Sequence, residues 1–118
     1  ANDWIDVSKQ KPFSRGSIHP LNQLQKEVED IFVTMGFDIA DGPEVETEWF
    51  NFDSLNIADD HPARDMQDTF WVKNDSKISQ ENLVLRTQTS GVQVREMLKN
   101  GAPLRLICPG RVYRNEEV

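Results

Sequence analysis

Residues 35–46 have the sequence MGFDIADGPEVE, and this stretch decides the fold that we predict. Gly36 is suited to the end of a helix, because glycine tolerates the left-handed backbone that often follows one. Residues 37–40 alternate between apolar and polar side chains, which is typical of a strand. Pro43 has no N–H for a sheet ladder, so it belongs at an edge or a bend. The stretch therefore predicts a helix that leads into an interrupted strand.

A helix is predicted immediately before this stretch. Pro20 follows His19 and suits the first helical turn, where its missing N–H would have no partner. Apolar residues then recur at spacings of three and four and form one stripe: Leu21, Leu24, Val28, Ile31, Phe32 and Met35. The stripe is explained either by packing on a sheet or by contact with a partner subunit. Residues 1–18 have no clear period, so we interpret them as a linker or an extended arm.

The chain after Pro43 alternates between extended and polar segments. Residues 45–52 have an extended pattern that ends in a short helical turn at residues 53–56. Residues 57–68 have no period and carry a dense cluster of charges. A polar loop of this length inside a compact domain is often functional, so we expect this loop to lie near a site.

The remaining segments predict a hairpin, a short helix and a final strand. Residues 70–72 and 83–87 are suited to the two strands of the hairpin. Ser90 and Gln93 fit a capping box at the start of the helix. Residues 104–113 follow as the last strand, with an interruption at a Pro-Gly pair. This order predicts an α+β fold, an antiparallel sheet with flanking helices.

The composition fits one small globular domain. The chain has 118 residues and a net charge of −7, and no apolar run approaches the ~20 residues of a membrane span. The acidic excess argues against binding of nucleic acid by charge alone, because phosphate binding needs clustered Lys and Arg. Cys108 is the only cysteine, which indicates a reducing, cytoplasmic location. The spacing of His19, His61 and Cys108 is too wide for zinc ligand pairs, so we predict no metal site in this chain.

Several segments resemble those of a known enzyme family. Residues 35–46 resemble motif 1 of class II aminoacyl-tRNA synthetases, in which a long helix feeds a strand with a proline. The segments HPARDMQDTF (61–70) and LRTQTS (85–90) resemble bacterial-type phenylalanyl-tRNA synthetase alpha subunits. The segment PGRVYRNE (109–116) resembles the first strand of motif 2. The resemblance identifies residues 19–118 as the N-terminal part of a class II catalytic domain, from motif 1 through the first strand of motif 2.

The resemblance implies a ligase activity for the complete subunit. In the family, phenylalanine reacts with ATP in the presence of Mg²⁺, and the resulting adenylate passes its acyl group to tRNA(Phe). Alpha subunits of the family pair with beta subunits in heterotetramers, and their tRNA contacts and magnesium ligand lie outside the segment seen here. We therefore expect a fragment that is inactive alone. The alternative is a short non-catalytic paralogue, a protein-binding module on a class II scaffold.

Arg114 and Glu116 receive roles in ATP binding from the resemblance. Arg114 is expected to be catalytic, because a guanidinium offers fixed donors to the negative charge that builds on the alpha phosphate. Glu116 lies two residues further on the same strand face and is expected to hold the adenine. Without the motif, the favoured explanation of Arg114 is a surface ion pair with Glu116 or Glu117, and the motif reverses this preference.

Gln88 and Ser90 are expected, by resemblance, to contact the amino and carboxyl end of phenylalanine. Ser90 is also explained as the helix cap described above, and some family members carry histidine at the position of Gln88. A zwitterionic amino acid needs polar partners of this kind at the mouth of its pocket.

Arg64, Gln67 and Trp71 are candidate neighbours of the pocket. Trp71 is also explained as a core residue, and Arg64 as one half of a local ion pair with Asp65, which would contribute little energy. Pro43 belongs to motif 1, which builds a subunit interface in the class, and we expect that interface to be with the beta subunit.

Overall fold

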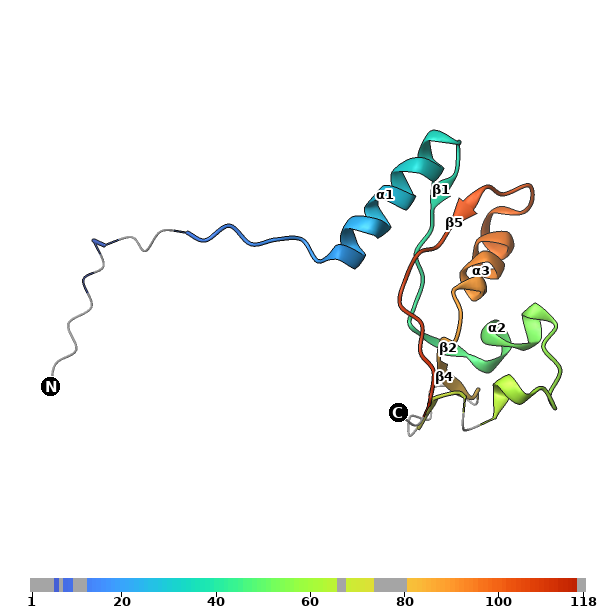
Figure 1. The fold of residues 1–118 in the computed structure, drawn as a ribbon. Helices are drawn as coiled ribbons and strands as arrows, with labels where there is room; N and C mark the ends of the chain where they lie inside the picture. Colours follow the sequence, from blue (N-terminus) through green and yellow to red (C-terminus); the bar gives the residue numbers. More distant parts are fainter. Residues whose placement is uncertain (1–5, 7, 10–12, 66–67, 74–80, 117–118) are drawn as a thin grey trace, which may run out of the picture.

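The computed structural model describes residues 6, 8–9, 13–65, 68–73 and 81–116 (Figure 1). Its helices and strands, in chain order, are α1 (Pro20–Thr34), β1 (Asp38–Ile39), β2 (Val45–Thr47), α2 (Glu48–Asn51), β3 (Trp71–Val72), β4 (Leu83–Leu85), α3 (Ser90–Asn100) and β5 (Leu106–Ile107). Two single turns of 3₁₀ helix lie between α2 and β3, at Asp53–Leu55 and Pro62–Arg64. In Figure 1, α1, β1 and β5 form one end, and α2, β2 and β4 form the other.

Helix α1 begins and ends as its sequence predicts. The side chain of His19 caps the first turn, where its Nδ1 accepts a hydrogen bond from the Leu21 N–H at 3.1 Å. Pro20 is the first helical residue. Gly36 follows the helix with φ of 85°, a conformation that residues with a β carbon rarely adopt.

The apolar stripe of α1 is not covered by the described residues. The helix contains no buried residue, and Leu21, Leu24 and Ile31 are 69%, 57% and 58% exposed. Only the end of the helix is in aromatic contact, where the rings of Phe32 and Phe37 meet edge to face at 5.3 Å. The interpretation of the stripe as a face packed on this chain's own sheet is therefore wrong for the described residues. No helix among them is long and apolar enough to cross a membrane.

The strands form two small sheets, of which one matches the predicted antiparallel arrangement. Strands β2, β4 and β3 are antiparallel in that order, with Val45 opposite Leu85 and Trp71 opposite Val84. The predicted hairpin is therefore confirmed. Strands β1 and β5 form a separate parallel pair, with Asp38 opposite Leu106, which the sequence pattern did not indicate. A parallel pair needs a long crossover, and here the crossover includes both α2 and α3.

Three local expectations are corrected. The extended segment predicted for residues 45–52 ends at Thr47, whose Oγ1 accepts from the Phe50 N–H at 3.3 Å and starts α2. Ser90 is not the N-cap of α3 but its first helical residue; Thr89 precedes the helix and makes no side-chain cap bond. The last predicted strand shrinks to Leu106–Ile107, because only these residues pair with β1.

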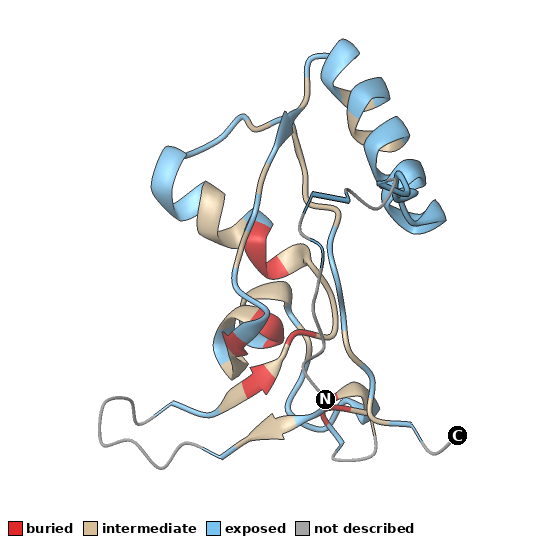
Figure 2. Ribbon diagram, turned by 90° about the vertical axis from the view of Figure 1, so that its left-hand side faces the viewer, coloured by how far each residue is buried: buried red, intermediate tan, exposed pale blue. Residues whose placement is uncertain are grey.

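The core lies between α2, α3 and β4 and is partly polar (Figure 2). Its buried apolar residues among those described are Phe52, Val84 and Val92, each at most 1% exposed. Nearly as buried are the polar residues Glu46, Asn51, Arg64, Thr69 and Arg86. Burial of a charge is costly unless it is paired, so the buried Glu46, Arg64 and Arg86 each need partners within the fold.

Candidate functional site

A hollow of about 340 Å³ opens where the loop after α2 meets the segment after β5. Its lining residues are His61, Pro62, Ala63, Asp68, Thr87, Tyr113 and Arg114. The loop of residues 57–68 thus lies beside Arg114. The His61 side chain caps the 3₁₀ turn, with Nδ1 accepting from the Ala63 N–H at 3.1 Å, so in its neutral form the ring carries its proton on Nε2.

Arg114 is held between two carboxylates. Its Nη1 lies 2.6 Å from Glu116 Oε1, and its Nε and Nη2 both lie 3.4 Å from Asp68 Oδ1. The side chain of Arg114 is 67% exposed, so its charge is open to an approaching anion. The sequence suggested an ion pair between Arg114 and Glu116, and the structure contains that pair. It adds a second acidic partner, Asp68, that the sequence did not indicate.

Arg86 fixes the backbone that carries Arg114. It is 3% exposed, and its Nε donates to the Arg111 carbonyl at 2.7 Å while its Nη1 donates to the Gly42 carbonyl at 3.1 Å. The Tyr113 N–H donates in turn to the Arg86 carbonyl at 3.0 Å. A β carbon at Gly110 would lie 2.5 Å from Arg86 Nη2, so this glycine leaves the space that the guanidinium occupies.

Sequence reasoning missed Arg86 and Asp68. For Arg86 a signal existed, because it lies two residues after the apolar Val84 and so shares one face of the predicted strand 83–87, where a charge would need partners. For Asp68 the signal was only its place in the polar loop. A further pair that joins distant segments is Tyr113 and Glu44, whose hydroxyl and carboxylate are hydrogen bonded.

Gln88 and Ser90 lie beside the hollow and do not line it. The Gln88 Nε2 donates to the Asn51 carbonyl at 3.1 Å, and Ser90 is half-buried at the start of α3. The neighbouring Thr87 lines the hollow, and its Oγ1 accepts from Asn51 Nδ2 at 3.0 Å. Asn51 thus ties α2 to the segment that contains both candidate amino-acid ligands.

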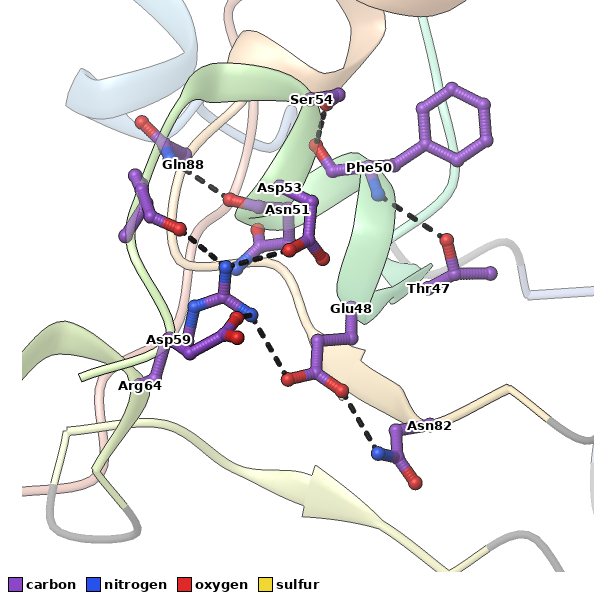
Figure 3. A network of polar contacts seen from close by, with 11 residues as sticks. Thr47, Glu48, Phe50, Asn51, Asp53, Ser54, Asp59, Arg64, Asn82 and Gln88 are labelled. Atoms are coloured by element: carbon purple, nitrogen blue, oxygen red, sulfur yellow. Dashed lines mark hydrogen bonds and ion pairs between the residues drawn. The ribbon is translucent and has the colours of Figure 1, made fainter. Parts of the chain in front are cut away.

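Arg64 is the buried cation of an ionic network whose acids are partly or almost fully exposed (Figure 3). Its guanidinium lies 3.1 Å from Glu48, 2.9 Å from Asp53 and 3.4 Å from Asp59, and it also donates to the Ile57 carbonyl. The hydrogen bond that Arg64 donates to Asp53 raises the pKa of Arg64, which stays charged. The local pair with Asp65 that the sequence suggested is replaced by these partners, and the side chain is not among those that line the hollow.

The other candidate residues have different places. Trp71 is half-buried on β3 with its ring 6.4 Å from that of Phe52, and its buried Nε1 has no hydrogen-bond partner among the described residues. Pro43 is exposed between β1 and β2. Gln67 lies outside the described residues.

Cys108 and the acidic residues suggest no metal centre in the described part of the chain. Within it, no group of three or more His, Cys, Asp and Glu side chains could hold an ion. Burial raises the pKa of the Cys108 thiol, an effect partly offset by the positive charge of Arg86. The thiol therefore stays protonated and behaves as a small apolar side chain.

Comparison with known proteins places these residues in a family context. Residues 4–118 match the family described as tRNA synthetases class II core domain (F). The chain is 56% identical over 115 residues to the phenylalanine–tRNA ligase alpha subunit of Bifidobacterium animalis, covering 93% of this chain and 32% of the relative. It is 52% identical over 119 residues to the subunit of that name from Parabacteroides distasonis, covering 100% of this chain and 34% of the relative. The chain thus spans about a third of the length of these relatives.

A solved structure supports the fold. It is described as an ATP phosphoribosyltransferase regulatory subunit/histidyl-tRNA synthetase from Bacillus halodurans C, with a TM-score of 0.54 and 23% identity. The likeness covers 96% of this chain and 30% of that one. Since the match to the core-domain family extends over nearly the whole sequence, the chain belongs to the family of class II tRNA synthetase core domains.

Proposed function

We propose that this chain is part of the catalytic core of a phenylalanine–tRNA ligase alpha subunit, which activates phenylalanine with ATP and transfers it to tRNA(Phe). The observation that carries the proposal is Arg114, an exposed cation at the wall of a hollow, in a segment that matches a class II core domain. The similarity to subunits named as phenylalanine ligases supports the choice of substrate. The same comparisons do not favour the alternative of a non-catalytic binding module.

Arg114 is the residue to which we assign transition-state stabilisation. When the carboxylate of phenylalanine attacks the alpha phosphate of ATP, negative charge grows on the phosphate oxygens. A guanidinium that is already placed and oriented stabilises this charge without further reorganisation. Its fork of donors also suits two oxygens at once, which a lysine could not match.

Glu116 is assigned to the adenine ring. Its carboxylate is half exposed and is paired with Arg114. When a phosphate takes its place on the guanidinium, the acceptor oxygens of Glu116 become available to the exocyclic amine of adenine. In this way Arg114 would bind the phosphate of ATP while Glu116 binds its adenine.

Gln88 and Ser90 are assigned to the charged end of phenylalanine. Because the Gln88 Nε2 is engaged by the Asn51 carbonyl, the Oε1 of Gln88 is the atom that would accept from the ammonium group of the substrate. The hydroxyl of Ser90 would donate to the carboxylate. Asn51 holds this segment in place from α2 through its bonds to Thr87.

The partners that we propose follow from the same family. We assign a beta subunit as the protein partner, with Pro43 and motif 1 near that interface, and we place the enzyme in the cytoplasm. Mg²⁺ would accompany ATP. The described side chains do not form a site for it, so no step above depends on a metal ligand from this segment.

Phenylalanine-dependent exchange between ATP and pyrophosphate tests the proposal, with the complete alpha subunit co-purified with its partner subunit. We expect exchange with phenylalanine, and a loss of about 100-fold or more in Arg114→Ala, as for removal of one key charge-stabilising donor. Arg105→Ala is the matched control, because Arg105 is exposed and lies outside the hollow. Exchange that depends on a different amino acid, or that survives in Arg114→Ala, would contradict the proposal.

A further inference from the structure

Asp68 carries its carboxylate on a restrained backbone, next to the exposed cation of Arg114. Its backbone N–H donates to the Asp65 carbonyl at 3.0 Å, and its own carbonyl accepts from the Asn115 N–H at 3.3 Å. The next residue, Thr69, is 1% exposed and donates its hydroxyl to the Ala63 carbonyl at 2.6 Å. The backbone of Asp68 is therefore tied both to its own loop and to the segment that carries Arg114.

The side chain of Arg114 is less restrained than its backbone, which is held on both sides by the bonds of Tyr113 and Asn115. Arg114 belongs to an irregular segment after β5, and its long side chain is 67% exposed. An exposed ion pair of this kind contributes little to stability, since water screens it and ordering the side chains costs entropy. What such a pair does provide is a preferred orientation for the guanidinium.

The contacts divide the donors of the guanidinium in a specific way. Asp68 Oδ1 faces Nε and Nη2, both at 3.4 Å, whereas Glu116 faces Nη1 at 2.6 Å. Arginine has five N–H donors. With Asp68 on the Nε side, the outer edge formed by Nη1 and Nη2 becomes free for a phosphate as soon as Glu116 leaves.

We propose that Asp68 is a positioning residue for Arg114: it holds the Nε side of the guanidinium so that the Nη1–Nη2 edge meets the phosphate of ATP in the hollow. This inference rests on the proposed function. Asp68 does not touch the reacting atoms and acts only through Arg114. Its position at the wall of the same hollow is what allows both residues to meet one ligand.

Steady-state exchange kinetics of the complete alpha subunit with its partner test this role. We expect Asp68→Asn to lower kcat about tenfold with less than a twofold change in the KM for phenylalanine, because a misoriented group affects the transition state more than substrate binding. Asp68→Glu should recover part of kcat, since it restores the charge. Asp60→Asn is the matched control, because Asp60 is an exposed acid of the same loop that does not line the hollow.

A double-mutant cycle separates positioning from a purely structural effect. In an Arg114→Ala background, Asp68→Asn should have no further effect on kcat, since its target is gone. Equal reductions in both backgrounds, or an Asp68→Asn variant with wild-type kcat, would overturn the inference.

A measurement of ATP affinity tests the role of Asp68 even if the proposed function is wrong. If the wild-type complex catalysed no phenylalanine-dependent exchange, the proposed function would fail, and the dissociation constant for ATP, measured by calorimetry, would replace kcat in the cycle. Asp68→Asn should then change ATP affinity at least about threefold when Arg114 is present and not when it is absent. An unchanged affinity in both backgrounds would overturn the role of Asp68.

Discussion

Arg64 shows how a single buried charge can organise a loop. Its partners are spread over α2, the 3₁₀ turn that follows, and the loop up to residue 59, so one guanidinium joins three consecutive segments. Its Cζ also lies 5.0 Å from the centre of the Phe52 ring, in the middle of the core. Arg64 does not line the hollow, although its neighbour Ala63 does.

Replacement of Arg64 by alanine should destabilise this region by about 2–3 kcal/mol, because the charge-assisted hydrogen bonds of a buried cation to the partly exposed Glu48 and Asp53 would be lost. Hydrogen exchange of amides in α2 and the following turn, measured in the complete subunit, checks the effect locally. Lys26→Ala is the control, since it breaks a surface pair at 3.1 Å with Asp30 that should be worth at most about 0.5 kcal/mol. Equal protection in the two variants would show that the network is not what holds the loop.

At the scale of elements, contacts between residues distant in sequence hold β2, α2 and α3 together. Arg95 on α3 is paired with the buried Glu46 on β2 through Nε at 2.9 Å and Nη2 at 2.6 Å. The guanidinium of Arg95 also covers the ring of Phe50 on α2 at 3.9 Å. Gly91 allows α3 to approach α2, because a β carbon there would lie 3.1 Å from the Phe50 carbonyl oxygen.

Gly42→Ala should destabilise the fold by about 1–3 kcal/mol, because its β carbon would lie 2.4 Å from a methyl group of Val92, a core residue on α3. Combined with Val92→Ala, which removes that methyl group, the cost should be smaller than the sum of the two single costs. Thermal unfolding of the complete subunit gives these differences. Gly16→Ala serves as the control, since no atom of the described residues lies within 4 Å of the position of its β carbon and its cost should be close to zero. Strict additivity would mean that the two residues do not meet as described.

At the scale of the whole molecule, large apolar surfaces remain uncovered by the described residues. The stripe of α1 is exposed, and so are Met97 and Leu98 on α3, at 45% and 68%. Contiguous exposed apolar surface usually marks a place where further protein packs. Under the function that we propose, the beta subunit is the partner whose surface would cover these residues.

The 118 residues expressed alone should not activate phenylalanine. Arg114 and Glu116 are 67% and 52% exposed, and water around such groups weakens the electrostatic stabilisation that catalysis needs. The measurement is phenylalanine-dependent exchange of ATP and pyrophosphate, with the complete alpha subunit and its partner as the positive control. Activity of the short chain well above the background without phenylalanine would show that these residues form a sufficient active site.

The sequence alone determined the features that depend on local patterns. The stripe of α1, the proline at its start and the glycine after it predicted the helix, and the two strand-like segments 70–72 and 83–87 predicted the β3–β4 hairpin, because these signals act over a few neighbouring residues. The motifs around Arg114 also led to the family, which the comparison confirms. The roles of Arg114, Glu116, Gln88 and Ser90 remain proposals.

Only the tertiary structure decided which distant groups meet. Nothing near Arg64 in the sequence indicates Glu48 as a partner, and the local Asp65 was the wrong choice. The parallel pairing of β1 with β5 and the contact between Asp68 and Arg114 depend in the same way on how the chain returns after α3. The physical reason is that a buried or partly buried charge must be paired, and its partner is whichever group the fold brings near. Sequence periodicity indicates which face of an element is buried, but it does not identify the group that packs against that face.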